Sequence, residues 1–156
     1  MARYNKVGDE REKYLRVLLY IAFAALFFWW GLTHIFFKEF YFNYVFGVEF
    51  NVNDSFDNEA SEIIGVLCIA LAYGAFLAAR DPRENTNLIR VLIVAAIGCS
   101  LVFLYNILAG NAPISLFFNV VFLLVAVTAL VILYPGNRLL FASYFKSKKE
   151  GEVKTK

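Results

Sequence analysis

Charged side chains are scarce in this 156-residue chain, and long stretches of it have none. Only 18% of the residues are charged, whereas 60% are hydrophobic and the mean hydropathy is +0.60. Soluble domains typically contain about 25% charged residues, because they need a polar surface. A net charge of +2 is also too small for a nucleic-acid-binding module. The composition therefore excludes a disordered chain and a nucleic-acid partner, and it indicates a membrane protein.

The residue types that build catalytic and metal centres are also few. One His and two Cys exclude a secreted disulfide scaffold and a haem held by two His of one chain. There is no phosphate-binding glycine loop, nucleophile elbow or CxxC pair. The acidic stretch 51–59 lacks the spacing and the central Gly of a calcium-binding loop. We therefore expect no catalytic activity, no metal site and no dedicated cofactor.

Four segments contain no Asp, Glu, Lys or Arg. They are 17–37, 63–79, 91–111 and 114–134. A bilayer core of about 30 Å is crossed by about 20 apolar helical residues. The pattern predicts an all-α integral membrane protein, a four-helix bundle over residues 17–135. Gly110 and Pro113 interrupt the last two runs, so a tight hairpin is expected there.

The basic residues are distributed very unequally between the two sides of this predicted bundle. Fourteen of the 15 lie in segment 1–16, in the connection 80–90, or in the tail 136–156. Segment 38–62 has only Lys38. Because Lys and Arg concentrate on the cytoplasmic side, both termini are predicted to be cytoplasmic and the loop 38–62 to face outward. We expect a multi-pass protein of the cytoplasmic membrane, with cytoplasmic basic segments at 1–16 and 136–156.

The outer loop alternates aromatic and polar residues. This period of two predicts a strand or an extended segment, and an interfacial helix is the rival interpretation. The rings serve either as an aromatic anchor that seals the outer face or as a docking surface for a partner. The candidate docking residues are Phe40, Phe42, Tyr44, Phe46 and Phe50.

Glu62 and His34 are the candidate ligand-binding residues. The run 63–79 spans only about 26 Å at 1.5 Å per residue, so Glu62 is expected at the outer boundary, near the depth of His34. A carboxylate beside an imidazole would bind a proton, a cation or a polar headgroup. Alternatively, Glu62 lies in water at the helix start, where acids complement the dipole, and His34 turns to the outer interface.

Small residues recur at steps of three and four in the second and third runs. Such stripes let helices approach closely, so we expect these two helices to be in contact. The predicted packing residues are Gly65, Cys68, Ala72, Ala75, Ala79, Ala95 and Gly98. Buried cysteines usually behave as small apolar residues, which leaves redox chemistry at Cys68 and Cys99 as the weakest functional hypothesis.

Two short motifs flank the second run. Glu62-Ile63-Ile64-Gly65 opens it, and Ala78-Ala79-Arg80-Asp81-Pro82 closes it, before the tight hairpin. In these features residues 14–135 resemble the DoxX-like superfamily of small four-helix bacterial membrane proteins, including the BphX-like group. The resemblance implies an accessory or quinone-linked subunit of a membrane oxidoreductase. It supplies no catalytic motif.

The sequence thus supports two functional hypotheses. The first is a non-catalytic accessory or structural subunit of a larger membrane complex of respiratory, photosynthetic or oxygenase type. Its partners would be membrane lipids and other membrane subunits. The alternative is a stand-alone binder or carrier of a small apolar molecule, such as a quinone or a lipid, with Glu62 and His34 at its mouth.

Overall fold

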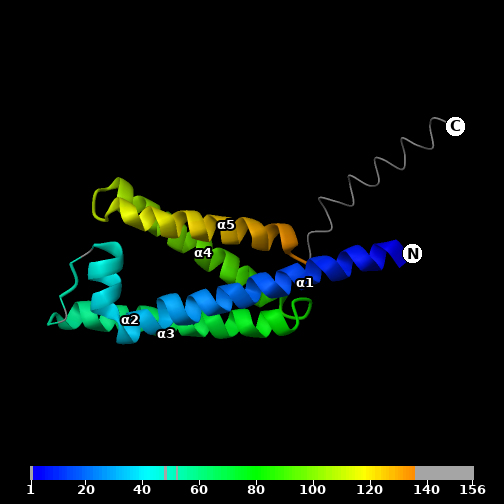
Figure 1. The fold of residues 1–156 in the computed structure, drawn as a ribbon, viewed down its shortest axis with the longest axis horizontal. Coiled ribbons are helices and arrows are strands. Elements are labelled where there is room, and N and C mark those ends of the chain that lie inside the picture. Colours follow the sequence, from blue (N-terminus) through cyan, green and yellow to red (C-terminus); the bar gives the residue numbers. More distant parts are fainter. Residues whose placement is uncertain (1, 48, 52, 136–156) are drawn as a thin grey trace.

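The computed structural model describes residues 2–47, 49–51 and 53–135, and all the regular structure within these ranges is helical. The elements follow one another as α1 (Ala2–Ala24), η1 (Ala25–Leu32), α2 (Thr33–Phe36), η2 (Phe40–Phe46), α3 (Ser55–Arg80), α4 (Thr86–Leu108), η3 (Ile114–Leu116) and α5 (Phe117–Leu133). Figure 1 shows α1 lying along α3, and α4 lying along α5, with η2 at one end between the two pairs. The predicted basic tail 136–156 lies outside the described residues.

Four helices are long and apolar enough to cross a membrane: Glu10–Phe36, Ser55–Arg80, Thr86–Leu108 and Ile114–Leu133. The all-helical prediction with four apolar helices is confirmed. The second of them is longer than its charge-free run, because Asp54 caps it well before Ile63. One Asp54 carboxylate oxygen accepts the backbone N–H of Phe56 at 2.8 Å. A helix of 26 residues is long enough to cross the bilayer core, so α3 does not need the bilayer to adapt to a short span.

The first long helix, Glu10–Phe36, changes its winding along its length. Residues Ala25–Leu32 form a π-helix between the α-helical α1 and α2. The Thr33 hydroxyl donates hydrogen bonds back to the carbonyls of Trp29 and Trp30. π-Helical turns often occur at functional sites, because they change the direction in which side chains project. Here the π-helix carries the buried Trp30.

The core is built where all four long helices meet. Its buried members are Leu15, Leu19, Ala75, Ala78, Ala79, Ile89, Leu92 and Leu130. The three alanines let α1 approach α3 closely, since their side chains end at Cβ. Nearer to η2, Gly65 has the same role: a Cβ there would lie 2.9 Å from the carbonyl oxygen of Gly31.

The connection between α4 and α5 is the tight hairpin that the sequence predicts. Gly110 has φ = +74°, a left-handed conformation that glycine adopts without steric cost. Pro113 then precedes the single 3-10 turn η3, which leads directly into α5. The helices on either side therefore pack as antiparallel neighbours.

The aromatic segment after the first long helix is not a strand. Phe40–Phe46 forms the π-helix η2, which ends at Gly47 with φ = +67°. The extended interpretation is therefore wrong for these residues, and the helical alternative is the one that the structure adopts. A backbone hydrogen bond from Tyr41 N to Phe37 O, 2.9 Å long, joins η2 to the end of the first long helix. An isolated strand would have left these backbone groups unpaired.

Candidate functional site

The candidate site is a buried cluster around Tyr41, on the inner face of η2. Tyr41 is only 3% exposed and packs with Trp30 in a core of its own. Its ring lies 4.7 Å from the His34 ring and 5.9 Å from Trp29, measured between centroids. Leu116 and Leu123, from the α4–α5 pair, close the other side. We call Trp30, His34, Tyr41 and Asn119 the Tyr41 cluster.

His34 is buried, and its hydrogen bonds define its tautomer. Nδ1 lies 2.7 Å from the carbonyl oxygen of Trp30. Because a carbonyl oxygen only accepts, Nδ1 holds the proton, and Nε2 is an acceptor in the neutral form of the imidazole. The His34 carbonyl accepts a hydrogen bond of 2.9 Å from the Ser61 hydroxyl, which joins the first long helix to α3. His34 is thus fixed within the bundle and does not extend to an interface.

Asn119 brings α5 into the cluster. Its side chain is 1% exposed and lies beside the Tyr41 phenol, as does the side chain of Trp30. Burial raises the pKa of Tyr41, and the hydrogen bonds with these two side chains offset only part of the increase. The phenol therefore stays protonated. Among the described residues, Asn119 Nδ2 is a buried donor without a hydrogen bond of good geometry.

Glu62 lies outside this cluster and pairs with Lys38. The Lys38 ammonium is 2.6 Å from Glu62 Oε1 and 2.9 Å from Asn58 Oδ1. The Lys38 side chain is 13% exposed, whereas that of Glu62 is 55% exposed. The structure places Glu62 and His34 on adjacent helices but does not join them. The carboxylate faces Lys38, and the imidazole faces Tyr41.

The predicted docking residues divide into two groups. Phe40 and Tyr44 are 58% and 78% exposed, and their rings stack 6.1 Å apart. Phe42 and Phe50 are half-buried and stack on each other at 5.0 Å. The side chain of Phe46 lies outside the described part of the structure. The helical winding of η2 causes this division, because residues four apart share a face and neighbouring residues do not.

The small residues of the two predicted stripes have different environments. Gly65, Ala72, Ala75 and Ala79 are buried, mainly where α3 meets the first long helix, and Cys68 is half-buried beside the Tyr41 cluster. On α4, Ala95 is half-buried, while Gly98 is exposed and a Cβ there would meet nothing within 4 Å. The main partner of α4 is α5.

Sequence reasoning missed Tyr41, Trp30 and Asn119 as a group. The one available signal was Asn119, an amide side chain in a run whose other polar side chains are hydroxyl groups. Within the described ranges, no three His, Cys, Asp or Glu side chains are close enough to hold a metal ion. The cluster offers one neutral imidazole, one phenol and one amide. These groups can donate and accept hydrogen bonds.

No family model, curated protein or solved structure matches this chain. The resemblance to DoxX-like proteins therefore stays a prediction.

Proposed function

We propose that this chain is a non-catalytic subunit of a larger membrane-embedded complex, and that Phe40 and Tyr44 contact its partner. The observation that carries the proposal is the geometry of η2. Its exposed face presents two stacked rings, while its opposite face is held in the core by Tyr41. Aromatic rings that are already fixed lose little conformational entropy on binding. Tyr and Phe are enriched at protein interfaces for this reason among others.

The proposal includes a placement in the membrane. The four apolar helices cross the cytoplasmic membrane, both termini are cytoplasmic, and residues 38–62 lie on the outer side. The distribution of Lys and Arg supports this orientation. Large apolar side chains exposed on three helices, among them Val66, Val94 and Val125, support the contact with lipid.

The proposal that the chain is non-catalytic rests on the contacts of Glu62 and His34, the two candidate ligand-binding residues. Glu62 is engaged by Lys38, and His34 is enclosed by Trp30, Tyr41 and the hydrogen bond to Ser61. Both residues connect one helix to another. This is the use expected in a scaffold that holds neighbouring subunits, such as those of a respiratory, photosynthetic or oxygenase complex.

The test is the composition of the complex released from native membranes by a mild detergent. The full chain has an affinity tag at its C-terminus, and three versions are compared. Wild type is expected to retain defined partners in a fixed ratio. The double variant Phe40→Ala/Tyr44→Ala is expected to lose them. The control Tyr14→Ala/Tyr73→Ala removes two exposed rings elsewhere and is expected to keep them.

Two results would count against the proposal. If the wild-type chain purifies alone or only with copies of itself, the subunit role is wrong. If Phe40→Ala/Tyr44→Ala keeps the same partners in the same ratio, the contact through η2 is wrong.

A second function, binding of a small apolar molecule such as a quinone, is favoured by one observation. The Tyr41 cluster contains a buried donor, Asn119 Nδ2, that makes no hydrogen bond of good geometry to the described residues, and an acceptor, Nε2 of neutral His34. A quinone carbonyl would accept from the first, and a quinol hydroxyl would donate to the second. Extraction of the purified chain with organic solvent tests this function, since a bound quinone is recovered in stoichiometric amount only if the function is correct.

A further inference from the structure

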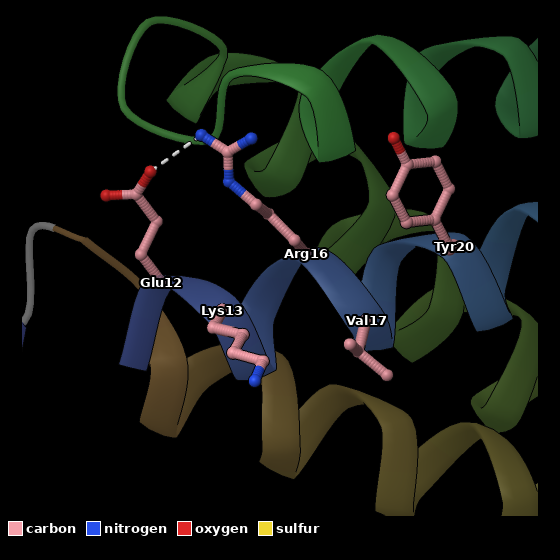
Figure 2. A pocket seen from close by; sticks show the side chains of 5 residues that line it. All are labelled: Glu12, Lys13, Arg16, Val17 and Tyr20. Atoms are coloured by element: carbon pink, nitrogen blue, oxygen red, sulfur yellow. Dashed lines mark hydrogen bonds and ion pairs between the residues drawn. The ribbon is translucent and has the colours of Figure 1, made fainter. Parts of the chain in front are cut away.

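A hollow lies on the outward face of α1, at the end of the molecule opposite η2. Figure 2 shows its lining residues, Glu12, Lys13, Arg16, Val17 and Tyr20. They fall within about two turns of one helix. Lys13, Val17 and Tyr20 are exposed. The hollow coincides with the point where the charged N-terminal segment changes to the charge-free run that begins at Val17.

The charged side of this hollow has an excess of cations. Glu12 accepts from two guanidinium groups: Arg16 Nη2 lies 2.8 Å from Oε1, and Arg83 Nε lies 2.6 Å from Oε2. Arg83 comes from the connection between α3 and α4. Both oxygens of the one carboxylate are thereby engaged, and Lys13 adds a third positive charge. Asp81 also acts on Arg16, so three cations stand against two carboxylates, and an anion that approaches the hollow meets a net charge of one positive unit.

The other side of the hollow is apolar and continues along the helix. Val17 and Ile21, one turn apart, are both more than half exposed. Tyr20 lies beside this surface, on the side of Arg16, and its ring makes a T-shaped contact with Phe76. Tyrosine is typical of the boundary between headgroups and acyl chains, because one end of its side chain is polar. The polarity thus changes along α1 in the same order as it does along a phospholipid.

We propose that this hollow binds an anionic phospholipid, with the headgroup phosphate at Lys13 and an acyl chain along Val17 and Ile21, which follow Lys13 at steps of four on the same face of α1. The proposal rests on the membrane placement given above, but it does not depend on the partner contact at η2. A zwitterionic lipid has the same phosphate, but its own cation cancels the attraction. Selectivity for the anionic headgroup is therefore the signature of the site.

The experiment is native mass spectrometry of the full purified chain in mild detergent, with phosphatidylglycerol or phosphatidylcholine added. Wild type is expected to retain phosphatidylglycerol preferentially. Lys13→Gln is expected to lower that retention about fivefold, the effect of one Lys or Arg at an anionic membrane surface. Arg80→Gln removes one exposed positive charge outside the hollow, and it is expected to leave retention unchanged.

Three results would overturn the proposal. Equal retention of the two lipids by wild type would show that there is no headgroup site. Equal losses in Lys13→Gln and Arg80→Gln would show an effect of net charge alone. Displacement of the lipid by millimolar inorganic phosphate would show that the free anion is the ligand. Failure of the membrane placement is distinguishable, since the chain would then retain no lipid of either class.

Discussion

The rings of His34 and Tyr41 lie 4.7 Å apart between centroids, inclined by 53°. This contact joins the end of the first long helix to the helix that follows it in the chain. The Ser61 hydroxyl holds the backbone of His34 from the other side. Detachment of η2 would therefore expose both a buried imidazole and a buried phenol. Phe40 and Tyr44 lie on the same helix as Tyr41, so core packing also holds these two exposed residues in place.

Replacement of Tyr41 by Ala should be strongly destabilising. The substitution removes a buried ring that contacts His34, Trp29 and Phe42, and such losses typically cost about 3 kcal/mol. Tyr44→Ala removes the same side chain from an exposed position on the same helix, and its effect should be small. Unfolding by sodium dodecyl sulfate in mixed micelles measures both. Equal losses of stability would show that η2 is not held through Tyr41.

Asn119→Leu should leave the free energy of unfolding unchanged or raise it. A buried donor without a hydrogen bond of good geometry costs about 1–3 kcal/mol, and the substitution removes it while keeping the same branched arrangement of side-chain heavy atoms. Ser100 provides the contrast, because its buried hydroxyl donates to the Ala96 carbonyl at 2.7 Å. The same unfolding assay compares Asn119→Leu with Ser100→Ala. A clear loss of stability in Asn119→Leu would mean that the amide is satisfied, as a bound molecule in the cluster would make it.

Gly65→Ala and Gly98→Ala form a matched pair. A Cβ at Gly65 would lie 2.6 Å from Ile35 Cγ1 and 2.9 Å from the Gly31 carbonyl oxygen, so the two helices would have to separate. Overpacking of this kind typically costs about 1–3 kcal/mol. At Gly98 nothing lies within 4 Å, and Ala favours the helix. Unfolding should therefore show a loss only at Gly65, and an equal loss at Gly98 would contradict the close approach of α3.

The pair Lys38–Glu62 should contribute only modestly to stability. The separation of 2.6 Å is short, but the Glu62 side chain is more than half exposed, so water screens the attraction. A double-mutant cycle of Lys38→Gln and Glu62→Gln is expected to give a coupling of about 0.5 kcal/mol. The coupling should decrease in high salt. A coupling near zero at low salt would contradict the ion pair.

The proposed orientation predicts which loops can be labelled from outside the cell. In a background with Cys68→Ala and Cys99→Ala, a single cysteine at Tyr44→Cys should react with a membrane-impermeant maleimide in intact cells. A cysteine at Glu84→Cys, also exposed, should react only after the membrane is permeabilised. The reverse pattern would invert the orientation, and labelling of both positions in intact cells would contradict the single crossing by α3 that is proposed between them.

The helices were predictable because their signals are local. Runs without charge, the hairpin residues Gly110 and Pro113, and the burial of the alanines of α3 all follow from neighbouring residues in the chain. The start of α3 at Ser55 was harder to predict from the sequence. The first residues of the helix and its cap, Asp54, lie in an acidic, polar stretch, and hydropathy identifies only the apolar part of a helix. The winding of η2 was ambiguous, since an alternating aromatic pattern is compatible with a strand and with an interfacial helix.

The sequence by itself determined that the chain has four long apolar helices and where charge interrupts them, because helix length and hydrophobicity are properties of contiguous residues. Only the tertiary structure decided which polar groups meet. Glu62 of α3 faces Lys38, and His34 of the first long helix faces Tyr41 of η2. Contacts between residues distant in the chain depend on how the helices rotate against one another. That rotation is set by close approaches such as Gly65 against Gly31; the stripe of small residues marks Gly65 as a packing position, but it does not say which residue Gly65 meets.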